Sequence, residues 1–431
     1  MNKDRIILYC DRIMVVCLCL TIFFLPFAKA VVESFVLFGL FLWLLKRFLG
    51  YRVKGAFWGM FPETGLNKAL GILIVINAMS VIFTVDFGLS LRGFLGKELK
   101  FIAIYFMLVE AINSKKRLKS ILFVIIASAV LITANAAVQY FRGVDFIRGY
   151  ALFVGLSSSF ASRNGFGAWL IVVIPLFSGL LAAGIPKRKS NKVLLLVLIV
   201  LLSICLLMTY SRGAWLGFIM GFLLAVFYAI KNINLKVKAT SLVVIISLVG
   251  IFLILPQPIK TKITSIGRIH FKANETINMR IKSLLKIEEG GSSLIRIKLW
   301  KEAIQIIKDY NFIGCGLNTY SIVARNYKSF NEGGVYPHNS YLHKAAEIGL
   351  LGLLAFLWVL FRFFKIGFCY LSQNKDFLVL GLLSGIVGFL VHAFFDAHLY
   401  SLQLVVLFWY MLGLTMAVIN LGTDSNQNPG G

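Results

Sequence analysis

Charged residues are scarce in this chain of 431 residues: they make up 14% of it, whereas hydrophobic residues make up 59%. A soluble domain carries about 25% charged and roughly 45–50% apolar residues. The mean hydropathy of +0.85 points the same way. This composition argues against a soluble enzyme, a disordered chain and a fibrous protein. It predicts an all-α polytopic membrane protein.

Cysteines and common catalytic motifs are also few. The six cysteines form no CxxC pair and five of them lie in or beside apolar stretches, so neither a disulfide framework nor a zinc site is predicted. No GxxxxGK(S/T) or HExxH motif occurs, and no DxD motif lies outside the apolar runs. These absences argue against ATP hydrolysis, zinc proteolysis and metal-dependent transfer from sugar nucleotides. We therefore expect an activity that needs neither a metal nor another cofactor.

Long apolar runs recur along the chain. A helix needs about 20 apolar residues to cross the hydrocarbon core. The first run follows Arg12 and has no cleavable signal pattern, so we expect it to remain as a membrane span. Twelve runs are candidate spans: 13–28, 30–45, 69–84, 99–112, 120–140, 165–184, 193–209, 213–230, 240–255, 347–367, 376–395 and 399–419.

The basic residues predict how these spans are oriented. The chain has 44 Lys and Arg against 18 Asp and Glu. With both termini in the cytoplasm, the inside loops hold 22 of these cations and the short outside connections hold 8. Cytoplasmic loops collect Lys and Arg, so this distribution favours that orientation and explains most of the positive charge without a nucleic-acid partner.

Four regions follow from the run pattern. Residues 1–255 are expected to hold nine spans, and residues 256–346 a helical extracytoplasmic loop domain. Residues 347–420 are expected to hold three more spans, and residues 421–431 form a polar cytoplasmic tail. The loop domain contains 14 Lys and Arg against six acids. Topology does not explain that excess, which suggests an anionic ligand or lipid headgroups on the outer side.

Arg212 lies in the segment SRGAW, in a very short outer connection between two apolar runs. Glycines follow it at every fourth position, which allows a second helix to approach closely. A guanidinium held in this way suits a phosphate clamp, although an arginine at a span end can also simply reach the membrane interface.

Arg296 and Trp300 are four residues apart on a helix predicted from Ser292 or Ser293 to about Tyr310. The spacing lets the guanidinium lie over the indole ring, and an anion would be favoured near the start of the helix. An ordinary amphipathic surface helix explains the same spacing.

His338 follows Pro337, in the segment HNSYL, where a new helix is expected to begin near Asn339 and continue into the next span. The positive end of a helix favours a neutral imidazole, which a general base requires. A structural histidine is the alternative. A second cluster, His392, Asp396 and His398, has too few ligands for a metal site, and a structural hydrogen-bonding role is the preferred interpretation.

In this order and spacing, these segments resemble the O-antigen ligase/polymerase superfamily over roughly residues 162–396. The motifs that carry the resemblance are Ser162-Arg163-Asn164, SRGAW around Arg212, the RxxxW of Arg296 and Trp300, Gly314-Cys315-Gly316, HNSYL from His338, and EIGLLG from Glu347.

The resemblance implies a GT-C-like membrane glycosyltransferase of the bacterial inner membrane, with its site on the periplasmic face. Such enzymes transfer a glycan from undecaprenyl pyrophosphate to lipid A–core or to another glycan acceptor. The resemblance implies that His338 is catalytic and that Arg212 and Arg296 bind the donor pyrophosphate. Four further residues are candidates for substrate binding: Arg163, Asn164, Asn339 and Trp300.

Three functions are consistent with these features. An O-antigen ligase is preferred, because a basic loop suits a phosphorylated core acceptor. A polysaccharide polymerase or a protein O-oligosaccharyltransferase of the same superfamily is the first alternative. A flippase or other transporter is less favoured, because transporters usually place ionisable residues near the middle of the bilayer and often show repeated halves.

Overall fold

The structure of the chain is a computed structural model, and it describes residues 3–54, 61–185, 187–229, 292–327 and 336–427. Within these ranges the regular structure is helical, and the only extended pairing is an isolated bridge between Val144 and Ala151. The prediction of an all-α protein is therefore confirmed. Six of the helices are long and apolar enough to cross a membrane: α1 (Lys3–Phe24), α6 (Lys115–Arg142), α7 (Arg163–Ala182), α8 (Lys189–Met208), α14 (Ser340–Gln373) and α16 (Leu402–Gln427).

The other predicted runs also fall on helices, apart from 240–255, which lies outside the described residues together with much of the expected loop domain. The twelve-span count, the four-region division and the GT-C-like class therefore remain predictions. These further helices are α2 (Lys29–Lys54), α3 (Asn67–Ile82), α5 (Lys100–Ala111), α9 (Arg212–Ala229) and α15 (Phe377–Ala393).

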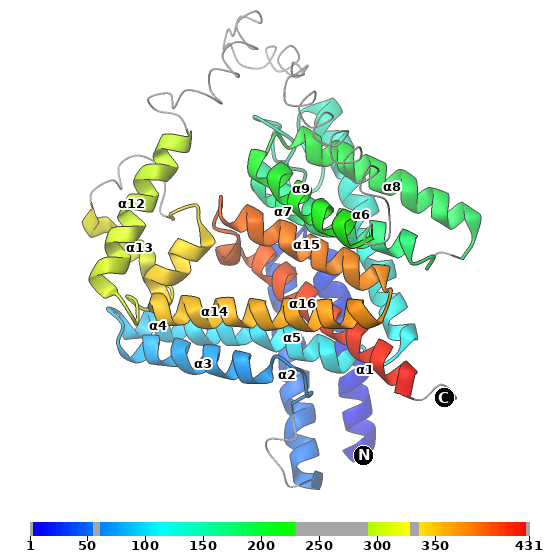
Figure 1. Cartoon of the computed structure of the whole chain (residues 1–431), viewed down its shortest axis with the longest axis horizontal. Helices are drawn as coiled ribbons and strands as arrows, with labels where there is room; N and C mark the ends of the chain where they lie inside the picture. The colour runs from blue at the N-terminus through cyan, green and yellow to red at the C-terminus, as the bar shows by residue number, and fades with distance from the viewer. Residues whose placement is uncertain (1–2, 55–60, 186, 230–291, 328–335, 428–431) are drawn as a thin grey trace, which may run out of the picture.

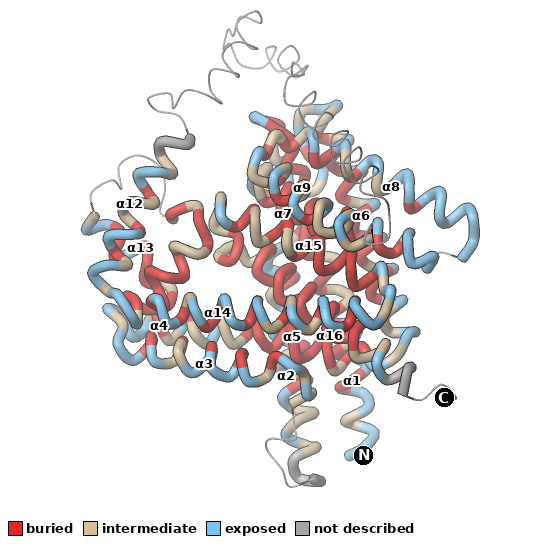
Figure 2. The backbone as a smooth tube through the Cα atoms, viewed as in Figure 1, coloured by how far each residue is buried: buried red, intermediate tan, exposed pale blue. Residues whose placement is uncertain are grey.

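Burial separates central helices from peripheral ones (Figure 2). In the most apolar stretch of each helix, 83% of the residues are buried in α7 and 94% in α16, but only 28% in α8. Several leucines and valines of α8 are half exposed or more, among them Leu194 and Val197. Such an apolar surface suits contact with lipid tails and is consistent with a multi-pass membrane protein.

Small residues bring α9 against α15. A Cβ atom added to Gly217 would collide with the carbonyl oxygen of Gly388, and one added to Gly221 would collide with that of Ser384. The glycine spacing therefore produces the close helix approach that it predicted. This contact holds the first residue of α9, Arg212, beside the C-terminal end of α15.

The short apolar run at 99–112 is the last part of a longer helical stretch. It is preceded by α4 (Phe87–Gly93) and by a π-helix, η2 (Phe94–Leu99), which continues directly into α5. A π-helix widens the turn and is frequently found at functional sites. The apolar pattern alone gave no sign of it, because hydropathy does not distinguish a π-turn from an α-turn.

The described part of the loop region packs at the end of the bundle where α14 begins (Figure 1). It contains α12 (Ser292–Tyr310), α13 (Tyr320–Val323) and the short helix η6 (Ala324–Tyr327). The predicted extent of α12 is confirmed. The helix stops where Asn311 adopts a φ of +36°, in the left-handed region that Asn tolerates better than most residues.

The helix α14 begins next to Asn339, as predicted, and continues into the next apolar run with a kink. At the kink, Gly349 has a φ of +68°. The Gly314–Gly316 turn packs there: the backbone N–H of Cys315 donates to the carbonyl of Ala346 at 2.9 Å, and that of Gly316 donates to the carbonyl of Glu347 at 2.9 Å. Two of the resembling motifs are therefore in direct contact.

Candidate active site

The predicted site residues come from four elements that meet around the loop between α15 and α16 (Figure 1). These elements are the N-termini of α7 and α9, the helix α12 and the segment before α14. The contacts described below join residues far apart in the sequence.

His338 lies two residues before the first residue of α14, and its side chain is 40% exposed. Its φ of +45° is in the left-handed region, which is strained for a non-glycine residue and is often found at active sites. The Nδ1 atom lies 2.9 Å from Oδ1 of Asp396. A neutral imidazole that donates Nδ1–H to this carboxylate keeps the lone pair on Nε2.

The sequence predicted a neutral imidazole because His338 was placed at the positive end of a helix, and the structure gives a different reason. Asn339 is the N-cap of α14, so His338 lies outside the first helical turn. The helix N-terminus is therefore not what positions the ring. Asp396 orients the ring and selects its tautomer, as the carboxylate does in Ser-His-Asp triads.

Asp396 accepts three hydrogen bonds: from Nδ1 of His338, from Nδ2 of Asn164 at 2.8 Å and from the backbone N–H of Ala397 at 2.8 Å. Burial alone raises the pKa of this carboxyl group. The hydrogen bonds and the charges of His338 and His398 outweigh burial and hold the pKa well below its usual range. Asp396 is therefore ionised at neutral pH.

Asn164 connects Asp396 to a second histidine. The hydroxyl of Ser211 donates to Oδ1 of Asn164 at 2.9 Å and lies 3.4 Å from Nε2 of His392. The rings of His392 and His398 meet edge to face, with centroids 4.2 Å apart. Among the described residues, no group of three His, Cys, Asp or Glu side chains is arranged to hold a metal ion.

Arg212 is exposed at the start of α9, and Arg296 is partly buried in the second turn of α12. Burial lowers the pKa of Arg296, the charge of Asp396 raises it, and the charge of Arg212 lowers it. The two guanidinium groups and the carboxylate therefore interact electrostatically. Neither guanidinium forms an ion pair within the described ranges, so both charges are available to an anion.

Trp300 differs from the expectation. The cation–π contacts of the described residues do not include Arg296 over Trp300. The indole instead packs edge-on against Phe394, with ring centroids 5.4 Å apart. Its Nε1 atom is buried without a described hydrogen-bond partner. Trp300 thus contacts the loop that carries Asp396, and that competing aromatic contact accounts for the missing stack.

The other two candidates have structural contacts of their own. Oδ1 of Asn339 accepts hydrogen bonds from the backbone N–H groups of Tyr341 and Leu342, at 2.9 and 3.0 Å. Arg163 donates from Nη1 to the carbonyl of Tyr210 at 3.3 Å, which ties α7 to the turn before α9. Both contacts position the backbone on which His338 and Arg212 lie.

An apolar groove of about 530 Å³ lies between α9, α14 and α15. Leu216 is one turn beyond Arg212, and Phe395 directly precedes Asp396, so the groove leads to the charged residues. Its lining residues are Leu216, Met220, Tyr341, Val387, Leu390, Val391, Phe394 and Phe395.

Asp396 is the residue whose importance sequence reasoning missed. It was grouped with His392 by helical spacing, and the structure instead pairs it with His338, 58 positions earlier. Acids are rare in the connections predicted to lie on the outer side, and a lone carboxylate between two apolar runs was the available signal.

Comparison with known proteins agrees with this picture. No curated protein matches the chain. A family model described as O-antigen ligase matches residues 197–357, a stretch that contains Arg212, Arg296 and His338. This match over residues 197–357 supports the resemblance to the O-antigen ligase/polymerase superfamily.

Proposed function

We propose that this protein is an O-antigen ligase that transfers a glycan from undecaprenyl pyrophosphate to lipid A–core on the periplasmic face of the bacterial inner membrane. The family match supports a ligase or polymerase type of activity, carried out by a glycosyltransferase-like membrane enzyme on polyprenyl-linked glycans. The observation that carries the finer proposal is the His338–Asp396 pair, located next to two arginines that have no ion-pair partner among the described residues.

In the proposed reaction, His338 acts as a general base. Its Nε2 atom takes the proton from the acceptor hydroxyl while that oxygen attacks the anomeric carbon of the donor sugar. Asp396 accepts Nδ1–H and stabilises the imidazolium that forms. The bond between the anomeric carbon and the pyrophosphate oxygen breaks, and its electrons leave with the pyrophosphate. This direct displacement inverts the anomeric configuration.

Arg212 and Arg296 would bind the leaving pyrophosphate. Negative charge grows on the bridging oxygen as the glycosidic bond breaks, and fixed cations stabilise that charge without a metal ion. Each charge-assisted hydrogen bond contributes about 1.5–3 kcal/mol. Because the donor already carries an activated leaving group, no nucleotide is needed.

The apolar groove would hold the polyprenyl chain of the donor. Its lining is apolar along its length, and it reaches Arg212 at one end of α9 and the Asp396 loop at the end of α15. A lipid tail in this groove would bring the pyrophosphate headgroup to the arginines and the first sugar to His338. Burying apolar chain contributes about 0.8 kcal/mol per CH₂ group.

Transfer by the purified protein tests the proposal. The assay supplies lipid-linked glycan with lipid A–core, or lipid-linked glycan alone, each with and without EDTA. A ligase glycosylates the core, with or without EDTA. Longer lipid-linked chains in the second mixture would identify a polymerase instead, and loss of transfer that magnesium restores would contradict the metal-free mechanism.

A further inference from the structure

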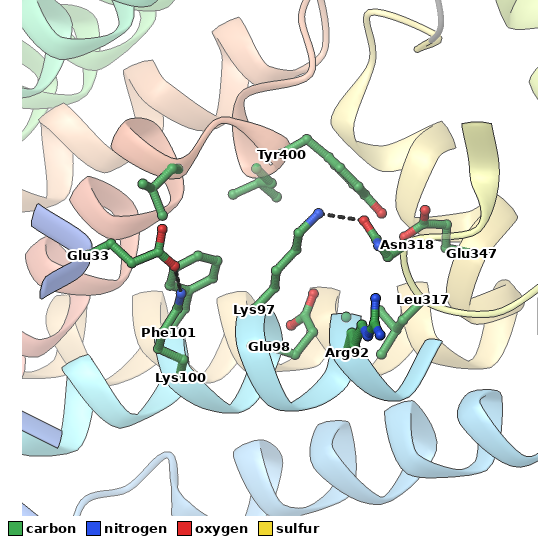
Figure 3. Close-up of a pocket in the computed structure, with 14 residues that line it drawn as sticks. Glu33, Arg92, Lys97, Glu98, Lys100, Phe101, Leu317, Asn318, Glu347 and Tyr400 are labelled. Carbon is green, nitrogen blue, oxygen red and sulfur yellow. Dashed lines mark hydrogen bonds and ion pairs between the residues drawn. The ribbon is translucent and has the colours of Figure 1, made fainter. Parts of the chain in front are cut away.

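A second cavity, of about 320 Å³, is lined in part by Tyr400, in the loop between α15 and α16 (Figure 3). Its lining comes from α4, η2, the start of α5, the turn at Leu317 and Asn318, and the residues around Tyr400, together with Glu33 and Glu347. It is distinct from the apolar groove, because the two share no lining residue. None of its lining residues has a role in the proposed transfer reaction.

The acidic residues of the cavity all have partners. Glu33 is paired with Lys100, and Glu98 accepts a hydrogen bond from Lys344 at 2.7 Å. Glu347 accepts the backbone N–H of Tyr320 at 3.1 Å and is also close to His343. Glu33 and Glu98 are therefore neutralised by lysines, whereas Glu347 has no lysine or arginine partner among the described residues.

Two cations of the cavity, Lys97 and Arg92, have no carboxylate partner in the part of the chain that the structure describes. Lys97 donates to the neutral side-chain oxygen of Asn318 at 2.5 Å, and its ammonium group lies 5.8 Å from the ring centre of Tyr400 (Figure 3). Arg92 has no hydrogen bond or ion pair with any residue in the described ranges. Arg92 and Lys97 thus outnumber Glu347, and the surplus positive charge of the cavity favours an anionic group such as a phosphomonoester.

The backbone shapes this arrangement. Lys97 lies in the π-helix η2, whose wider turn changes the direction of the side chains relative to an α-helix. A Cβ atom added to Gly93 would lie 2.8 Å from the Cβ atom of Asn318, so only glycine allows the turn to approach this closely. The π-helix and the tight contact bring Lys97 and Asn318 into hydrogen-bonding distance.

Tyr400 connects the cavity to the proposed reaction centre. Its ring centre lies 5.8 Å from that of Tyr336, which is two residues before His338. The hydroxyl of Ser340 donates to the carbonyl of Asp396 and accepts from the backbone N–H of Leu399, which lines the cavity. These contacts join the lining of the cavity to the segments that carry His338 and Asp396.

We propose that this cavity binds a phosphate group carried by the acceptor glycan, held by Arg92 and Lys97. The inference rests on the proposed function, in which an acceptor and a donor meet at His338. An attacking hydroxyl must approach opposite the leaving pyrophosphate, so the acceptor needs a subsite away from Arg212 and the groove.

The test compares acceptor kinetics in Arg92→Gln, Lys97→Gln and a matched control, Arg142→Gln, which removes an exposed cation that does not line the cavity. The acceptor is phosphorylated lipid A–core or the same core after phosphatase treatment. With the phosphorylated core, each cavity variant should raise the acceptor KM about tenfold or more, as expected for a charge-assisted contact, and leave the donor KM unchanged. With the dephosphorylated core, the variants and the wild type should be equal.

An increase in donor KM, or equal losses with both acceptors, would overturn the assignment. A binding assay without donor tests this inference independently of the proposed transfer reaction. It measures how much radiolabelled phosphorylated core the purified protein retains. Binding that depends on Arg92 and Lys97 supports the subsite even if no core is glycosylated, whereas binding independent of both refutes it even in an active ligase. Competition by phosphatidylglycerol vesicles equal to that by the core would assign the cavity to lipid headgroups and refute the inference.

Discussion

Replacing Asp396 by Asn removes one charge while keeping the shape of the side chain, and the effect follows from the donors around it. Oδ1 accepts from His338 and Ala397, and Oδ2 accepts from Asn164. An amide has only one oxygen, so its NH₂ group must face either Asn164 or His338. If the NH₂ group faces Asn164, two NH₂ groups oppose each other. If it faces His338, Nδ1 must accept its hydrogen bond, so the imidazole proton moves to Nε2 and Nε2 can no longer act as a base.

The expected loss is large in either orientation. A lost hydrogen bond to a charged group costs about 1.5–3 kcal/mol, or about tenfold to more than a hundredfold in rate. The wrong tautomer costs about 10⁴-fold in the Ser-His-Asp triad. We therefore expect Asp396→Asn to lower kcat at least about a hundredfold, with a small change in donor KM, because Asp396 positions His338 and does not itself bind donor.

A double variant distinguishes positioning from general structural damage. In Asp396→Asn with Asn164→Asp, the new carboxylate at position 164 accepts the NH₂ group of the new amide and still accepts the hydroxyl of Ser211. The amide oxygen then faces Nδ1–H of His338, and the reactive tautomer returns. Single-turnover transfer should recover at least about tenfold over the single variant. A double variant no faster than Asp396→Asn, with both proteins folded, would refute this reasoning.

Four further outcomes are expected. His338→Gln should slow transfer about a hundredfold or more, because an amide cannot act as a base at neutral pH, and a Gln variant with most of the rate would leave the histidine only a binding role. Arg212→Ala and Arg296→Ala should raise the donor KM, with only partial recovery by Lys, which lacks the planar fork; wild-type rates at low donor concentration would move the pyrophosphate site elsewhere. Burial lowers the pKa of His398 to about 4, with Asp396 opposing that shift. The unfolded chain therefore binds the extra proton below about pH 6.5, and the free energy of unfolding should fall by up to roughly 3 kcal/mol between pH 6.5 and 4. The free energy of unfolding of His398→Gln, measured in detergent, should depend less on pH over this range. The same pH dependence in the variant and the wild type would contradict the role of His398. A cysteine at position 189 should resist impermeant labels in intact spheroplasts, whereas labelling there would reverse the proposed orientation.

The helices could be predicted because their signals are local. Apolar runs of bilayer length marked their positions, and the glycine spacing after Arg212 indicated a close helix contact that the structure contains. The end of α12 was also readable, because Asn311 and Gly314 favour backbone conformations that stop a helix. The π-helix η2 could not be predicted, because a widened helical turn leaves the hydropathy pattern unchanged.

The site was only partly predictable, because its key contact is not local. The resemblance selected His338, Arg212 and Arg296 from short motifs, but no spacing rule links His338 to Asp396 across 58 positions. Helical spacing paired Asp396 with His392 because it counts positions along one helix, and α15 ends before Asp396. The same rule predicted the Arg296–Trp300 stack without the competing ring of Phe394.

The hydrogen-bond network at the site and the close packing inside the bundle depend on the same helix ends. Asn164 is on α7, Ser211 directly precedes α9, and Asp396 follows α15. Below the site these three helices approach one another closely. A Cβ atom added to Gly217 of α9 would collide with the backbone of α15, and one added to Gly167 of α7 would lie 2.7 Å from the Cβ atom of Ala214, in the first turn of α9. Helices in lipid gain little from the hydrophobic effect between them, so small-residue packing is what fixes their separation. Hydrogen bonds of 2.8–2.9 Å between residues on different helices require that separation to be fixed. The glycines therefore contribute to the site by setting distances, although none of them needs to contact substrate.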